Sequence, residues 1–426
     1  MNTRPMPKIF RILDIKRDEV KLLLTAFLFM FVLFCSYSLL RPLRDSMGIA
    51  GGIKDLKWLF SATFVATLLG SLLSMWASSI LKRRNFISAV FIFFIVNLLV
   101  FYGCFRYLPH DNEAFVWVAR GFFVWTSLFV MFVISVAWSL ISDVFNREQS
   151  NRLFGIIAAG VSLGSIVGSS VVSLLAAKMG IDSLVLCSVF LLIAASFLKN
   201  ALLMQIKHSP TFSERFDNPV GAKNPFVGFK ILFSSRYLLL FGVFIVLLSS
   251  AATFLYMEQV RLVALLFKSK EEHISAFATI NLVVQVMSLL GQLLITGFVS
   301  KKLGMRFLLC FVPLSVGIGF VVLCLSHPAF VPFIIVFVLR SVGEYTLIRP
   351  AREMLFVPLD GDSKYKVKNF LDTVVYRGGD ALSAQIESWL RQESVQVALL
   401  SGAACCLAWG VCGWVLGSRY QKKEFS

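Results

Sequence analysis

Long apolar stretches recur from one end of this chain to the other, and they constrain its fold more than any other feature. Each is about 20 residues long, enough for a helix to cross a hydrocarbon core about 30 Å thick. Twelve can be counted, at 22–40, 59–80, 86–105, 115–141, 153–178, 184–205, 237–257, 275–298, 307–326, 329–348, 370–390 and 395–417. We therefore predict an all-α integral membrane protein with twelve transmembrane helices.

The charge content agrees with this prediction. Only 15% of the 426 residues are charged, whereas about a quarter is usual for a soluble protein. The least apolar stretch is 370–390, which contains Asp372, Arg377, Asp380 and Glu387. It is the least certain of the predicted spans.

Lysine and arginine are distributed unequally between alternate loops. The loops on the side of the termini hold 26 of these residues and the opposite loops hold 10. The positive-inside rule therefore predicts that both termini are cytoplasmic. As the location we expect a bacterial inner membrane. The net charge of +17 follows largely from this asymmetry, so it favours contact with anionic lipid and does not indicate nucleic-acid binding.

A polar, proline-containing segment at 206–235 divides the chain into two sets of six spans. We predict an N-terminal six-helix bundle at 1–205, a cytoplasmic linker at 206–235 and a C-terminal six-helix bundle at 236–426. The halves echo each other weakly, as in WSLISD at 138–143 and YTLIRP at 345–350. This layout is typical of two bundles of the major facilitator type around a central cavity.

Three glycines are spaced four residues apart in the fifth stretch. Gly160, Gly164 and Gly168 share one face of the predicted helix, where small residues let another helix approach closely. We predict a packing role, because a phosphate-binding loop would need a preceding strand and a lysine at fixed spacing.

Charged residues within the apolar stretches are the candidate functional residues. A charge near the centre of a spanning helix costs about 2.5–3.5 kcal/mol on insertion scales, so it is kept where it faces water, a partner or a ligand. The candidate substrate-binding residues are Arg41, Arg44, Asp45, Arg120, Glu258, Asp372, Arg377 and Asp380. Arg340 and Glu344 lie four residues apart, and we interpret them as a structural ion pair.

Simpler interpretations exist for two candidates. Arg120 lies near the start of its stretch and could extend to the membrane interface. Arg41 could be an interface anchor. Arg44 and Arg377 are harder to explain in this way, because Pro42 could kink the first helix and a glycine pair follows Arg377. We hypothesise that these two arginines, one from each half, bind an anion bidentately in the cavity.

Other chemistry is not indicated. The four histidines lie in predicted loops without clustering, and the eight cysteines show no CxxC spacing. We therefore expect no metal, no cofactor and no enzymatic activity. A membrane-bound monomer that acts on a small anionic molecule is the simplest expectation.

Two segments carry a family resemblance. LLRPLRDSMG at 39–48 and FVPLDGDSKYKVKNFLDTVVYRGGDALS at 356–383 resemble the ATP:ADP antiporter family, the nucleotide transporters of plastids and obligate intracellular bacteria. The resemblance implies a twelve-helix facilitator-like fold and phosphate binding by Arg44 and Arg377. It also matches Glu258 approximately to a required acidic residue of helix seven.

The chain departs from the family pattern in several places. Arg44 replaces the usual lysine, Thr126 stands where helix four carries an acidic residue, and the chain is shorter than typical members. These departures count against strict ATP/ADP exchange. From the resemblance and the charged spans together we expect a secondary transporter of an anionic solute, with a nucleotide as the first candidate, working by alternating access. The alternatives are a carrier of another organic anion, such as a sugar phosphate or carboxylate, and a non-transporting membrane receptor.

Overall fold

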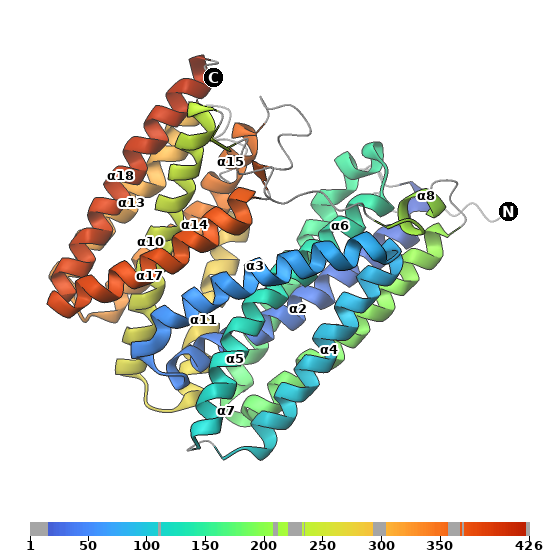
Figure 1. Ribbon diagram of the computed structural model, residues 1–426, viewed down its shortest axis with the longest axis horizontal. Helices are drawn as coiled ribbons and strands as arrows, with labels where there is room; N and C mark the ends of the chain where they lie inside the picture. Colours follow the sequence, from blue (N-terminus) through green and yellow to red (C-terminus); the bar gives the residue numbers. More distant parts are fainter. Residues whose placement is uncertain are drawn as a thin grey trace. The chain divides into compact units, whose positions relative to one another are not determined.

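The described part of the chain is helical throughout (Figure 1). The computed structural model describes residues 16–109, 112–207, 212–219, 232–233, 235–292, 304–356, 367–368 and 370–422. These residues contain no β-strand, only one isolated β-bridge between Lys82 and Pro219. The predicted all-α class is therefore confirmed.

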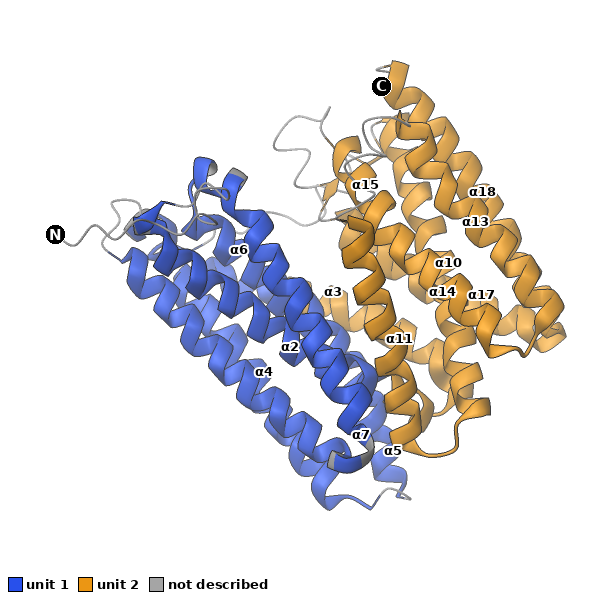
Figure 2. Cartoon of the chain, turned by 180° about the vertical axis from the view of Figure 1, so that it is seen from behind, with its two compact units in different colours: residues 1–44, 73–222 blue, residues 45–72, 223–426 orange. Residues whose placement is uncertain are grey.

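The chain forms two compact units (Figure 2). Unit 1 contains residues 1–44 and 73–222, and unit 2 contains residues 45–72 and 223–426. Most of the predicted linker at 206–235 lies outside the described residues. Two helices cross the division between the units, one between Arg44 and Asp45 and the other between Leu72 and Leu73.

Unit 1 and the two helices that cross the division contain seven of the described α-helices. Their bounds are α2 (Val20–Ala50), α3 (Leu56–Ile80), α4 (Arg83–Tyr107), α5 (Glu113–Phe129), α6 (Ser135–Val144), α7 (Arg147–Ile206) and α8 (Phe212–Phe216). Short 3-10 turns at Arg17–Glu19 and Ile53–Asp55 precede α2 and α3. A kink at Gly180, where φ is 73°, divides α7 into two spans, because a positive φ suits glycine.

Unit 2 contains the remaining spans. Its helices are α10 (Arg236–Leu266), α11 (Lys270–Gly291), α13 (Gly304–Ser326), α14 (Phe330–Gly343), α15 (Arg349–Leu355), α17 (Tyr376–Glu393) and α18 (Val395–Lys422). Eleven described helical stretches in the chain are long and apolar enough to cross a membrane. The predicted span at 370–390 is helical as well, but its charged residues keep it outside this group.

The glycines of the fifth span pack directly on α2. A Cβ at Gly160 would lie 2.8 Å from the carbonyl oxygen of Phe27, and one at Gly168 would lie 2.6 Å from that of Cys35. At Gly164 a Cβ would overlap the carbonyl oxygen of Phe31. The predicted packing role is confirmed, and we call this contact between α2 and the first part of α7 the glycine seam.

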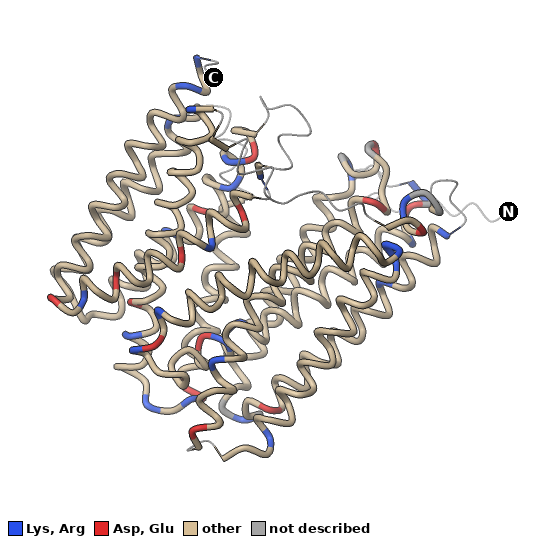
Figure 3. The backbone as a smooth tube through the Cα atoms, in the orientation of Figure 1, with Lys and Arg blue, Asp and Glu red and all other residues tan. Residues whose placement is uncertain are grey.

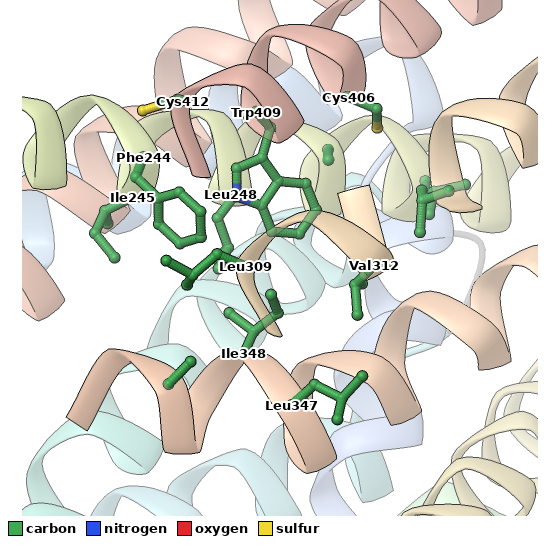
Figure 4. Packing of buried hydrophobic residues seen from close by; sticks show 14 of the residues in the cluster. Phe244, Ile245, Leu248, Leu309, Val312, Leu347, Ile348, Cys406, Trp409 and Cys412 are labelled. Carbon is green, nitrogen blue, oxygen red and sulfur yellow. The ribbon is translucent and has the colours of Figure 1, made fainter. Parts of the chain in front are cut away.

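An apolar core fills unit 2 around Trp409 of α18 (Figure 4). Trp409, Phe244 of α10 and Leu309 of α13 are all 0% exposed. The rings of Phe244 and Trp409 lie 5.8 Å apart. Burying large apolar side chains from α10, α13 and α18 against one another fixes how these three helices pack.

Candidate functional site

Most charged residues lie near helix ends, but several lie well inside helices (Figure 3). The segment LLRPLRDSMG at 39–48, which we call the first motif, is one such case, and FVPLDGDSKYKVKNFLDTVVYRGGDALS at 356–383 is the second motif. The predicted span at 22–40 is shorter than the helix, because α2 continues through Pro42 to Ala50. Arg41, Arg44 and Asp45 are therefore helical residues and do not belong to a loop at the membrane surface.

The residues of the first motif divide between the two units. The guanidinium of Arg44 lies 4.9 Å from the ring centre of Phe123 on α5, a cation–π distance within unit 1. Asp45 belongs to unit 2, is 3% exposed, and accepts a hydrogen bond of 2.8 Å from the Tyr256 hydroxyl on α10. Arg41 is half-buried.

Arg120 occupies a different environment. Its guanidinium lies 4.8 Å from the ring centre of Trp117, one helical turn earlier on α5. Trp117 is 63% exposed, and an arginine beside an exposed tryptophan is typical of a membrane interface. This contact favours the simpler interpretation of Arg120.

The predicted span at 237–257 stops too early, because Glu258 lies inside α10, which continues to Leu266. Glu258 is 2% exposed and forms an ion pair with Arg391 of α17. His327, in the turn between α13 and α14, places Nε2 3.1 Å from the second carboxylate oxygen of Glu258. The sequence analysis missed this partner, since His327 follows Glu258 by many residues and no local pattern joins them.

A second ion pair lies one turn along the same two helices. Arg261 donates to Glu387, with Nη2 2.7 Å from Oε2. Further along α10 and α17, Thr253 donates a hydrogen bond of 3.0 Å to Asp380, and Ser383 donates one of 2.7 Å to the Ser250 hydroxyl. We call this set of contacts between α10 and α17, with Glu258–Arg391, the polar seam.

Arg340 and Glu344 form the ion pair expected from their spacing. Nη2 of Arg340 lies 2.7 Å from Oε2 of Glu344, so the prediction is confirmed. Glu344 is 6% exposed and also has Nε of Arg349 at 3.5 Å. The Tyr376 hydroxyl contributes a further polar contact to Arg340, which connects α14 to α17.

The charged residues of the eleventh span pair with arginines. Asp372 is 41% exposed at its side chain and forms an ion pair with Arg352 of α15. Arg377 lies 3.4 Å from Asp380, one turn later on α17. The Asp380 side chain is 10% exposed and that of Arg377 is 25% exposed, so the arginine is the more accessible member of its pair.

These pairs form a cation-rich cluster in unit 2. Its members are the arginines 340, 349, 352 and 377 and the carboxylates of Glu344, Asp372 and Asp380. Four arginines face three carboxylates, and Nε of both Arg340 and Arg352 is buried without a hydrogen-bond partner among the described residues. Such a cluster can accept an anion, because a carboxylate or phosphate would match the excess charge and the free donors.

Two π-helical segments contribute residues to this cluster. Glu344–Ile348 separates α14 from α15, and Leu371–Val375 precedes α17. A third, Val130–Ile134, separates α5 from α6 in unit 1. Segments of this kind often occur at functional sites, because the wider turn leaves backbone groups and side chains in unusual positions.

Several expected features of the site stay predictions. Arg44 belongs to unit 1 and Arg377 to unit 2, so their convergence on one cavity is not tested. Thr126 donates a hydrogen bond to the Phe122 carbonyl and is fully buried. Most of the acidic and basic part of the second motif, at 357–366, lies outside the described residues.

Comparison with known proteins places this geometry in context. The family model described as Major Facilitator Superfamily matches residues 22–349. A search of curated protein sequences finds no match. The structural comparison finds many transporters with similar folds.

Three solved structures illustrate the similarity. The nucleoside transporter NupG aligns with a TM-score of 0.63 and 14% identity, covering 95% of this chain and 99% of that chain. The xylose transporter XylE from E. coli aligns with a TM-score of 0.62 and 12% identity, covering 95% of this chain and 96% of that chain. A bacterial homolog of the human lysosomal transporter Spinster aligns with a TM-score of 0.61 and 13% identity, covering 96% of this chain and 99% of that chain. At these identities the likeness concerns the fold alone.

Proposed function

The chain belongs to the Major Facilitator Superfamily, and from this premise we propose that it carries an organic anion, with a nucleotide as the leading cargo. Membership makes the protein a multi-pass secondary transporter for a small molecule, and a carrier rather than an enzyme. The bacterial inner membrane, cytoplasmic termini and a monomeric state complete the proposal.

The cation-rich cluster is the observation that carries the proposal. Its excess arginine and its unpaired buried N–H groups would be costly in a purely structural network. An anionic ligand would satisfy them, and a guanidinium binds phosphate and carboxylate groups bidentately. Arg377 can reach a ligand, since its side chain is 25% exposed and its contact with Asp380 is long at 3.4 Å. Arg349, with a side chain 55% exposed and Nε 3.5 Å from Glu344, is a second accessible arginine of the cluster.

The nature of the anion rests on two further arguments. The resemblance of both motifs to ATP:ADP antiporters supports a nucleotide, with Arg44 as a second phosphate-binding residue from unit 1. A different organic anion is the second candidate, since Thr126 is engaged with its own helix and offers no acidic group at the expected place.

Uptake into proteoliposomes tests the site. Vesicles loaded with unlabelled ATP are expected to take up labelled ATP or ADP, and Arg377→Gln is expected to reduce uptake at least about tenfold, since a hydrogen bond to a charged group contributes about 1.5–3 kcal/mol. The matched control is Arg106→Gln, whose side chain is 60% exposed and pairs with Asp182. Equal uptake by both variants would show that Arg377 is not a substrate residue.

A thermal-shift series separates the two candidate cargoes. A bound ligand stabilises the protein by about 2.7 kcal/mol at a hundredfold excess over its Kd. We expect ATP and ADP to raise the Tm, and Arg377→Gln to reduce that rise. A rise with citrate or a sugar phosphate and none with any nucleotide would replace the first candidate with the second.

A further inference from the structure

Tyr345 is the accessible residue of a π-helical segment that contributes to the cation-rich cluster. The segment Glu344–Ile348 lies within the tenth span, and its other four residues are buried, between 0% and 6% exposed. Tyr345 is half-buried. The wider turn therefore leaves one side chain of the segment accessible, and that side chain is a flat aromatic ring.

The guanidinium of Arg349 lies over this ring. Its central carbon is 4.3 Å from the ring centre of Tyr345, closer than the 4.9 Å between Arg44 and Phe123. Arg349 is nevertheless loosely held, because its side chain is 55% exposed and its Nε lies 3.5 Å from the carboxylate of Glu344. A cation–π contact at an exposed site is weak, so another planar group can replace the guanidinium on this face of the ring.

Tyr345 and Arg349 belong to the polar side of the tenth span. Arg349 interacts electrostatically with Tyr376, the first residue of α17, and so does Arg340. A guanidinium directed into lipid from within a spanning helix would be costly, whereas these contacts keep Arg349 among polar groups. The ring and its guanidinium are therefore part of the same cluster as Arg377, the residue that follows Tyr376.

The ring and its guanidinium differ from the rest of the cluster in what they can bind. Arg340, Arg352 and Arg377 each contact a carboxylate, and either a phosphate or a carboxylate of a ligand would suit them. An aromatic face gives such an anion no advantage, but it stacks on a planar ring, and the plane of an arginine does the same. The pair can therefore select among anions by the group that carries the charge.

We propose that Tyr345 and Arg349 bind the nucleobase of the cargo, which stacks between the tyrosine ring and the guanidinium. Arg349 moves away from the ring by the thickness of the base and then covers its other face. The phosphates contact Arg377 and the neighbouring arginines, so one cluster binds both ends of the molecule. This inference rests on the proposed function, and it gives a physical reason for a nucleotide over citrate or a sugar phosphate, neither of which has an aromatic ring.

Ligands that contain only part of a nucleotide test this assignment. Isothermal titration calorimetry on the purified protein in detergent compares ADP, ribose 5-phosphate and pyrophosphate. Tyr345→Leu removes the flat ring, and we expect it to weaken ADP binding about fivefold or more, as the loss of one base stack does. The affinities for ribose 5-phosphate and pyrophosphate are expected to stay unchanged, because neither ligand has a ring to stack.

Further variants separate stacking from folding. Tyr345→Phe keeps the ring and is expected to bind ADP as the wild type does. Arg349→Lys keeps the charge but removes the planar guanidinium, so we expect ADP to bind about fivefold more weakly and pyrophosphate to bind as before. This variant carries the test if Tyr345→Leu does not fold. The matched control is Trp414→Leu, because Trp414 pairs with Arg306 at 5.1 Å and shares no residue with the cluster; its ADP affinity is expected to be that of the wild type.

The possible results distinguish this inference from the proposed function. If Tyr345→Leu and Arg349→Lys bind ADP like the wild type, or lose ADP and pyrophosphate to the same extent, the pair does not bind the base, and the inference is wrong while the nucleotide cargo stands. Arg377→Gln is expected to weaken ADP and pyrophosphate alike, since it removes a phosphate contact. If the wild type binds citrate or ribose 5-phosphate but no nucleotide, the proposed cargo fails, and the base site fails with it.

Discussion

The glycine seam and the polar seam join equivalent helix pairs in different ways. Each lies between the first and fifth spans of its half of the chain, α2 with α7 and α10 with α17. In the glycine seam, backbone meets backbone, because Gly160, Gly164 and Gly168 leave no room for a side chain. In the polar seam, hydrogen bonds and ion pairs join the helices.

This difference indicates in which half of the chain the helix interface can replace its contacts with other ones when the helices shift. A backbone contact has one close-packed arrangement, and a displacement loses it without compensation. A polar seam contains donors and acceptors that can pair with water or a ligand when the helices shift. We infer that unit 2 carries the more adaptable of the two interfaces, in agreement with the cation-rich cluster beside it.

The largest expected effect comes from filling the glycine seam. Gly164→Leu would force a side chain into the carbonyl oxygen of Phe31, so we expect a loss of more than about 5 kcal/mol, and little folded protein. Size-exclusion chromatography in detergent and the Tm measure this loss. Gly155→Leu, on the same helix with no atom within 4 Å of its Cβ position, is the control. Equal yields of the two variants would contradict the close contact.

Breaking an ion pair of the polar seam should rank second. Glu387→Gln leaves the charge of Arg261 without its carboxylate, and removing one member of a buried pair costs about 3–5 kcal/mol. Glu353→Gln is the control, because Glu353 pairs with Lys368 at the surface with a side chain 58% exposed, where such pairs contribute about 0–1 kcal/mol. Denaturation in detergent compares the two. Similar losses would mean that the seam is hydrated.

A rescue experiment distinguishes the two seams directly. Gly379→Ala places a Cβ against the Ser249 hydroxyl, and we expect a loss of about 1–3 kcal/mol. Adding Ser249→Ala should recover most of it, since the obstacle is a side chain. The corresponding loss in Gly164→Ala should not be recoverable, because the obstacle there is the backbone of α2. The difference in Tm between single and double variants tests this, and no recovery at Gly379 would show that the backbone is the obstacle there too.

The smallest effect concerns acid stability at the start of the glycine seam. Burial raises the pKa of Glu19, but hydrogen bonds from Arg152 and Gln149 outweigh it and bring the pKa below its usual value. A lowered pKa means that Glu19 stabilises the fold above about pH 4.3 and loses this contribution as the pH falls through the folded-state value. We expect Glu19→Gln to lower the Tm at pH 7 by a few degrees and to match the wild type in acid. A difference that does not shrink as the pH falls below about 4.3 would contradict this account.

Some partners were predictable from the sequence and others were not. The ion pair of Arg340 with Glu344 followed from a spacing of four residues, and the glycine seam followed from the same periodicity. The partner of Glu258 is 133 residues away, so no local pattern indicates it. The predicted first and seventh spans end before α2 and α10 do, because the charges of Arg41 and Glu258 resemble the end of a span when their partners are unknown.

The sequence by itself determined that this is an all-helical membrane protein with a close contact at three glycines. Both conclusions depend on local quantities, the length of the apolar stretches and the spacing of the small residues. These quantities can be read from a segment without knowing what it packs against. Only the tertiary structure decided the partner of each charged side chain. Asp45 accepts a hydrogen bond from Tyr256, and the Arg44 guanidinium lies over the ring of Phe123. The physical reason is that a charge in an apolar environment is tolerated through its partner, and partners distant in sequence are brought together only by the fold.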